Sequence, residues 1–163
     1  MTANTTVLAT FILTFQGSLA LSLNQASVRP GETLRVDVTV SNPGPAVVVD
    51  VFFGLLLPAA RGSALGCPGG ETPLAFVTAG GVVLRCLSAS PATFPPRGEH
   101  ATVPAGLPAT TISNFFIAVI PGEAPPDNYT LFLVLTPAGA LADGLVDPGD
   151  IAASATTRFS IVP

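Results

Sequence analysis

Few residues of this 163-residue chain have side chains that could do chemistry. Cys67 and Cys86 are the only cysteines, and His100 is the only histidine. His100 lies in a Pro-rich stretch, where an isolated histidine is expected to be solvated rather than catalytic. The sequence has no serine–histidine–aspartate arrangement, no Gly-rich phosphate loop after a strand and no lysine for a Schiff base. We therefore expect no enzymatic activity.

The two cysteines are expected to pair. In an exported chain of this type Cys67 and Cys86 would form one disulfide, and the alternative is two buried free thiols. Gly80-Gly81 is a two-residue hairpin signal, and that turn would place Ala75 opposite Cys86. Residues 68–73 would then have to fold back to bring Cys67 to its partner.

Acidic residues gather in one segment, which contains Asp143, Asp147 and Asp150. Their offsets resemble the second half of a calcium-binding loop, but Gly139 and Leu141 stand where the first ligands would be. The alternative is a polar turn in which the aspartates cap their own backbone. Calcium is the one candidate metal, and no other cofactor is expected.

The elements that would position these residues are strands. From Leu34 to Val40 apolar and polar side chains alternate, which is typical of a half-buried strand. Further strands are expected at 19–23, 47–57, 75–77, 82–84, 112–120, 129–135 and 153–162, with a Gly-rich loop at 59–72 and a Pro-rich surface loop at 88–110. No segment has a sustained helical period. The pattern predicts an all-β sandwich of about eight or nine strands with an extra N-terminal strand.

Residues 1–17 would form that extra strand, ahead of a sandwich at 18–163. The apolar run at 7–15 is too short to span a bilayer, and without a preceding basic residue it is interpreted as part of the folded protein. Such an uncharged, apolar segment is an aggregation hazard when exposed. It could pair with its own sheet or with a neighbouring copy, as in donor-strand complementation. One face of the expected strand carries its assembly residues: Val7, Ala9, Phe11, Leu13 and Phe15.

Two stretches carry a family resemblance. LSLNQASVRPGETLRVDVTVSN at 21–42 resembles the opening of immunoglobulin-like modules of secreted bacterial and archaeal surface proteins, including the cell-adhesion-related domains of bacteria. NYTLFLVLTPAGALADGLVDPGDI and TTRFSIVP resemble the closing strands of such modules. The resemblance spans residues 18–163 in outline. It implies an immunoglobulin-like Greek-key sandwich and an exported location, and it implies no catalytic activity.

Tyr129 supports the sandwich independently. It is the only tyrosine, and it begins a strand just after Pro125-Pro126. A tyrosine there can bond its hydroxyl to nearby backbone, forming a tyrosine corner. The alternative is a simple half-buried strand residue. Asn4 and Asn128 each begin an N-glycosylation pattern, and whether either carries a glycan is left open.

The amino-acid composition excludes some classes of function. Hydrophobic residues make up 48% and charged residues 10%, and six scattered arginines in a chain of net charge −4 form no basic stripe for nucleic acid or an anionic membrane surface. With no tryptophan and ten phenylalanines mostly in expected strands, the chain lacks evident aromatic platforms for a glycan. We expect an extracellular or cell-surface structural subunit that self-assembles into a homo-oligomer, filament or layer. The alternative is an adhesive module that recognises a glycan or a partner protein.

Overall fold

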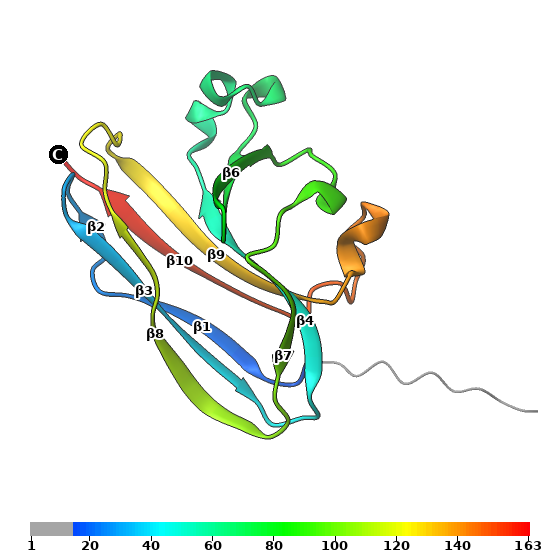
Figure 1. The fold of residues 1–163 in the computed structure, drawn as a ribbon. Coiled ribbons are helices and arrows are strands. Elements are labelled where there is room, and N and C mark those ends of the chain that lie inside the picture. Colours follow the sequence, from blue (N-terminus) through cyan, green and yellow to red (C-terminus); the bar gives the residue numbers. More distant parts are fainter. Residues whose placement is uncertain (1–14) are drawn as a thin grey trace, which may run out of the picture.

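The fold is a sandwich of two β-sheets, seen face to face in Figure 1. The computed structural model describes residues 15–163, so nearly all of the expected N-terminal strand lies outside the described part. The smaller sheet has the strand order β1 (Ser18–Leu23), β3 (Thr33–Asn42) and β8 (Leu107–Val119). The larger sheet has the order β2 (Ser27–Val28), β10 (Ala153–Ile161), β9 (Asp127–Pro137), β4 (Val47–Leu56), β5 (Pro73–Thr78) and β6 (Gly81–Cys86), with β7 (Gly98–Val103) also paired to β4.

The order of the strands is that of an immunoglobulin-like sandwich. The chain crosses between the sheets from β3 to β4 and again from β8 to β9, as Greek-key connections do. The strands β4, β9 and β10 correspond to the C, F and G strands of that fold, and β3 and β8 to B and E. The short strand β2 leaves the sheet of β1 and pairs in parallel with β10. The expected fold class is therefore confirmed.

Alternating side chains build the core between the sheets. Leu34, Val36 and Val38 of β3 are buried, and they face Phe53 of β4 and Leu131 of β9. Phe53 and Leu131 have no exposed surface, as expected for residues at the centre of such a core. The other face of the larger sheet is also apolar and is covered by loops, because Phe76 of β5 packs against Phe94 and Phe132. This explains why β4 is apolar on both faces.

Residues 88–110 are not only a surface loop, as the sequence had suggested. They contain β7 and the start of β8, and the structure has ten strands within the described residues rather than eight or nine. β4 pairs with β9 along one edge, and its other edge is shared between β7 at residues 47–51 and β5 at residues 54–56. The Pro-rich composition of residues 88–110 concealed the pairing of β7 with β4, which is distant in the sequence.

The hairpin of β5 and β6 turns one residue earlier than predicted. Thr78 pairs with Gly81, so Ala79 and Gly80 form the turn and Pro73 lies opposite Cys86. The prediction of Ala75 opposite Cys86 was wrong. The side chain of Thr78 sets this turn, because its Oγ1 donates to the carbonyl of Gly81 at 2.9 Å and accepts from the N–H of Gly80 at 3.2 Å.

Short 3-10 turns occupy the loops in place of longer helices. They are η1 (Ala59–Arg61), η2 (Ser63–Leu65), η3 (Pro68–Gly70), η4 (Pro91–Thr93) and η5 (Ala140–Asp143). Within residues 15–163 no helix is long and apolar enough to cross a membrane.

Candidate functional site

The two cysteines form the expected disulfide. Cys67 and Cys86 are bonded, with their Cα atoms 5.4 Å apart. The return of the chain through η3 brings Cys67 to the end of β6, beside Glu71. The Glu71 carboxylate accepts hydrogen bonds from the N–H and hydroxyl of Ser88 at 2.9 and 2.6 Å. This cluster is structural rather than a metal centre, because disulfide sulfurs are not thiolate ligands.

Two of the three aspartate carboxylates, those of Asp143 and Asp150, accept hydrogen bonds from nearby backbone. Asp143 accepts a hydrogen bond from the N–H of Leu145 at 2.9 Å, and Asp150 accepts one from the N–H of Asp147. In the part of the chain that the structure describes, their carboxylates do not form a group of three within 4.8 Å of one another. Calcium binding at this loop stays a prediction.

Tyr129 lies at the start of β9, the position of a tyrosine corner. Its hydroxyl donates to the carbonyl of Pro125, four residues upstream, at 2.8 Å. Its ring is buried and stacks on Phe159 with 5.4 Å between the ring centroids. Desolvation raises the pKa of the Tyr129 hydroxyl above its ordinary value; the Asp127 charge also raises it, and Arg61 lowers it.

The raised pKa predicts a loss of stability in alkali. The folded state holds the Tyr129 proton more tightly than the unfolded state, so this stabilisation is full below about pH 10 and is lost as the pH rises through the folded pKa. Tyr129→Phe should cost about 1 kcal/mol at pH 7, because the hydrogen bond to Pro125 is lost. It should also flatten the stability curve above pH 10. Urea unfolding at pH values from about 7 to about 11.5 tests this prediction. The chain has no lysine and no other tyrosine, so no other side chain of these two types titrates in this range.

His100 contributes its backbone rather than its imidazole to the interactions that the structure shows. Its N–H donates to Asp50 at 2.8 Å, and its φ is 51°, a left-handed value that is unusual for a residue with a side chain. The imidazole is exposed at the surface. The backbone hydrogen bond to Asp50 and the left-handed φ support a structural role for His100.

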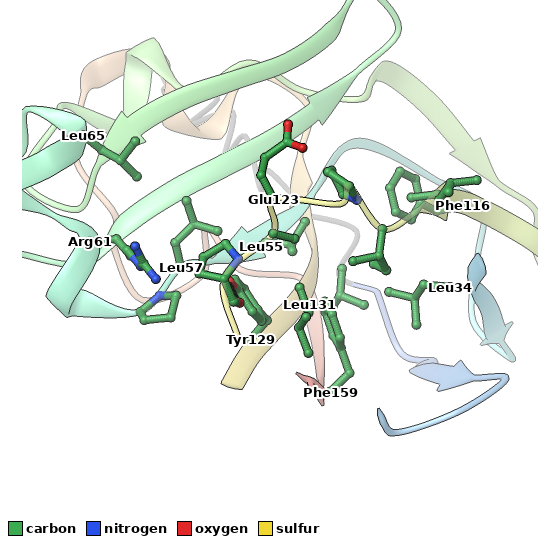
Figure 2. Close-up of a pocket in the computed structure, with 18 of the residues that line it drawn as sticks. Leu34, Leu55, Leu57, Arg61, Leu65, Phe116, Glu123, Tyr129, Leu131 and Phe159 are labelled. Carbon is green, nitrogen blue, oxygen red and sulfur yellow. Dashed lines mark hydrogen bonds between the residues drawn. The ribbon is translucent and has the colours of Figure 1, made fainter. Parts of the chain in front are cut away.

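An apolar cleft of about 530 Å³ opens between the two sheets, at the end where β4 ends and β9 begins. Figure 2 shows Arg61 and Leu65 on one side, Phe116 and Leu34 on the other, and Leu131 and Phe159 between them. Arg61 and Glu123 are the only charged residues among its lining, and both are exposed at the surface. The cleft exposes the edge of the main core to solvent.

The strand β8 forms one wall of this cleft and is a free edge of the smaller sheet. Within the described residues it pairs with β3 alone. The N–H and C=O of Ile120 bond toward β3, to Glu32 and Gly31. Because these groups alternate along an antiparallel strand, those of Ile117 and Val119 point away from β3, along the free edge. Exposed main-chain groups of this kind are a template for another strand.

The side chains of β8 also alternate between its two faces. Phe116 and Ala118 line the cleft, opposite Val36 and Leu34 of β3. The side chains of Ile117 and Val119 have the opposite parity and are 52% and 63% exposed, and Val119 also contributes to the lining of the cleft, whereas Ile117 does not. A strand added to this edge would therefore place every second side chain in the cleft.

Arg97 closes the gap between the sheets beside the cleft. Its backbone N–H donates to the carbonyl of Val51 on β4 at 2.7 Å, and its guanidinium donates to the carbonyl of Phe115 on β8 at 3.0 Å. The guanidinium also lies over the Phe115 ring, 4.7 Å from the centroid. The opposite side of the sandwich is closed by β1, which lies alongside β10 (Figure 1). Arg97 itself is not part of the lining of the cleft.

Phe15 is the one assembly residue that the structure describes. It is half-buried at the other end of the sandwich, against Val47, Val49 and Leu135. Val7, Ala9, Phe11 and Leu13 lie outside the described residues. Phe15 therefore lies at the end of the sandwich opposite the cleft.

Sequence reasoning did not find the cleft. A signal for it was present in the run from Phe115 to Ile120, which is apolar at every position. A strand covered on only one face normally alternates with polar residues, so an edge strand that is apolar on both faces is unusual.

Comparisons with known proteins give similarity of fold alone. No family model matches the chain, and no curated protein matches it. Among solved structures it is similar to the CARDB domain of the PF1109 protein in complex with di-metal ions from Pyrococcus furiosus, at 13% identity and a TM-score of 0.44, over 98% of this chain and 100% of that one. It is similar to the sporulation control protein Spo0M from Bacillus subtilis at 12% identity and a TM-score of 0.43, over 89% of this chain and 48% of that one. It is also similar to the Pseudomonas fluorescens alkylpurine DNA glycosylase AlkC bound to DNA containing an abasic site analog, at 11% identity and a TM-score of 0.45, over 91% of this chain and 31% of that one. The chain thus spans less than half the length of the last two, and none of these similarities bears on activity or ligand.

Proposed function

We propose that this protein is a non-enzymatic, extracellular structural subunit that self-associates through its N-terminal segment, residues 1–17. The observation that carries the proposal is the free edge of β8, thirteen residues long and beside an opening into the core. A monomeric sandwich would be expected to protect such an edge with charges, prolines or a covering loop. Between Thr111 and Ile120 this strand has no charged residue and no proline.

An extracellular location agrees with two features. The disulfide Cys67–Cys86 is of the kind that persists in oxidising compartments. The sequence resemblance of residues 18–163 places the chain, in our proposal, among immunoglobulin-like modules of bacterial or archaeal surface proteins, of the cell-adhesion-related type. Such modules are scaffolds, and a scaffold agrees with the lack of an evident catalytic arrangement in the sequence.

The adhesive alternative would need a different surface. The outer face of the larger sheet offers an apolar hollow of about 200 Å³, whose lining includes Phe76, Phe94 and Leu141. Leu145 and Val146 beside it are 59% and 54% exposed. This chemistry suits an apolar protein partner better than a glycan, because a sugar needs polar groups around an aromatic platform.

The proposal predicts that charges on one face of the N-terminal segment abolish association. Phe11→Asp with Leu13→Asp should convert oligomers into monomers of 16.4 kDa, because burying an unpaired carboxylate costs several kcal/mol. The matched control, Thr10→Asp with Thr14→Asp, adds equal charge to the other face and should leave association intact. Analytical ultracentrifugation measures the mass, and negative-stain microscopy shows whether polymers form.

Salt provides a second readout for the same proteins. Association driven by apolar burial and backbone pairing should persist in about 1 M NaCl. The Debye length is then about 3 Å, so interactions between charges are screened. If the unaltered chain is monomeric at every concentration tested, the proposed function is wrong.

A further inference from the structure

We propose that the cleft beside β8 is the acceptor site for residues 7–13 of a second copy of this chain, which add as a strand to the free edge of β8, while Phe15 stays packed in its own molecule. This inference rests on the proposed function and names the surface that receives the donated segment. Its basis is the alignment of three features at one place: free main-chain groups, an open apolar cleft and a segment of matching chemistry.

The free main-chain groups determine how a strand would bind. Ile117 and Val119 direct their N–H and C=O groups outward, and a neighbouring strand would bond to them. Side chains of that strand lying level with Phe116 and Ala118 would then enter the cleft. Main-chain bonds would provide affinity, and the fit of alternate side chains would provide specificity.

The donor segment matches the cleft in chemistry and in period. Its odd-numbered positions from 7 to 13 are all apolar, whereas the even-numbered face includes Thr10. The cleft is lined mostly by aliphatic and aromatic side chains and prolines, with Arg61 and Glu123 as its charged residues. The segment has no charge to oppose or require either of them. An apolar face entering this cleft would bury surface that each copy otherwise exposes.

Reach favours a second copy as the donor, because Phe11 and Leu13 cannot extend to the cleft of their own molecule, although Val7, eight residues before Phe15, could extend about 26 Å. Phe15 packs against the cluster that contains Val49, and Leu55 at the cleft is six residue steps along β4 from Val49, a span of about 20 Å. Phe11 is four residues before Phe15, so an extended chain carries it only about 13 Å from that point. Leu13 reaches half as far. The two residues therefore fall short of the cleft in their own molecule, while a neighbour placed end to end can supply both.

This geometry leads to a polymer. The donor leaves one end of the sandwich and the acceptor opens at the other, so each copy uses two different surfaces. Such a heterologous contact repeats from copy to copy until a rotation closes it into a ring. The expected assembly is a head-to-tail filament.

Intermolecular cross-linking of the full chain tests the acceptor site. One population carries Phe11→Cys and a second, differently tagged population carries Ala118→Cys; the two are mixed and mildly oxidised. We expect a cross-linked heterodimer, because side chains level across paired strands have Cβ atoms close enough for a disulfide. Leu13→Cys and Ala9→Cys cover a shift of register by two residues. Mass spectrometry must show that the bond between Cys67 and Cys86 is retained.

Cysteines on the opposite face of the donor strand provide the matched control. Thr10→Cys and Ile12→Cys lie on the other face of the donor strand, so they should fail with Ala118→Cys and succeed with Val119→Cys. Ala118→Glu should weaken association by at least about a hundredfold, and Ile117→Glu, at a position outside the lining of the cleft, should not, provided that both proteins unfold at the temperature of the unaltered chain.

The outcomes separate the two proposals. If the protein assembles but no donor position cross-links to Ala118→Cys, the acceptor site is wrong and self-assembly stands. If one chain carrying both Phe11→Cys and Ala118→Cys forms only a monomeric cross-link, the segment pairs with its own molecule and the inference is overturned. A lipid found in the cleft by native mass spectrometry, without cross-links, also overturns it. If the chain never associates, the proposed function itself fails.

Discussion

Replacing Asp50 with alanine is expected to lower the free energy of unfolding by about 3 kcal/mol. Asp50 lies on β4 and is 9% exposed. Its two carboxylate oxygens accept hydrogen bonds from the N–H of His100 and the N–H of Gly139, each at 2.8 Å. Hydrogen bonds to a charged group contribute about 1.5–3 kcal/mol each, and the alanine variant loses both.

The position of these bonds makes the effect structural as well as energetic. His100 belongs to β7, and Gly139 precedes η5, so one carboxylate ties two distant segments to β4. Both residues have positive φ, 51° and 75°, and the bonds help to hold these uncommon backbone conformations. Loss of the carboxylate should loosen the loops that cover the outer face of the larger sheet.

Urea unfolding with a matched control measures the effect. Glu99→Ala also removes one negative charge, beside His100, but Glu99 is exposed, so its cost should stay within about 0.5 kcal/mol. Asp50→Asn keeps one acceptor oxygen and should fall between the two. Equal stability of Asp50→Ala and Glu99→Ala would contradict this account of the carboxylate.

Removing the disulfide is expected to have an effect of similar size. Cys67→Ala with Cys86→Ala should cost about 3 kcal/mol, because the bond closes a loop with a sequence separation of 19 residues and limits the entropy of the unfolded chain. Cys67 is also buried, and alanine leaves part of its space unfilled. Leu65 in the wall of the cleft is only two residues from Cys67, so the double variant should also associate more weakly.

Reductant provides the control for the disulfide. The unaltered protein in dithiothreitol should lose nearly as much stability as the double variant, and the double variant should not respond to dithiothreitol. Alkylation without reduction should find no free thiol. Two alkylatable cysteines in the untreated protein would show that the bond does not form in solution.

The sequence determined those features that depend on local pattern or on elimination. Alternation from Leu34 to Val40 identified a half-buried strand, since the side chains of a strand change face at every residue. The chain contains only Cys67 and Cys86, so any disulfide within it had to join these two, and the structure has that bond rather than two free thiols. The position of Tyr129 after two prolines led to the expectation of a bond to nearby backbone, and the structure has one to Pro125.

Tertiary structure decided features that depend on which distant strands meet. The hairpin turn moved by one residue because Thr78 bonds to the turn, and this moved the partner of Cys86 by two positions, from Ala75 to Pro73. β7 was concealed because its pairing with β4 joins residues about fifty positions apart.

The cleft depends on the three-dimensional arrangement most of all. Its lining comes from β3, β4, η1, η2, β8, β9 and β10, so no single segment of sequence outlines it. A period of two residues identifies which side chains share a face, but it does not specify which strand is left at the edge of a sheet. Only the order of the strands shows that β8 has no second partner among the described residues. The same order explains why the core opens beside it.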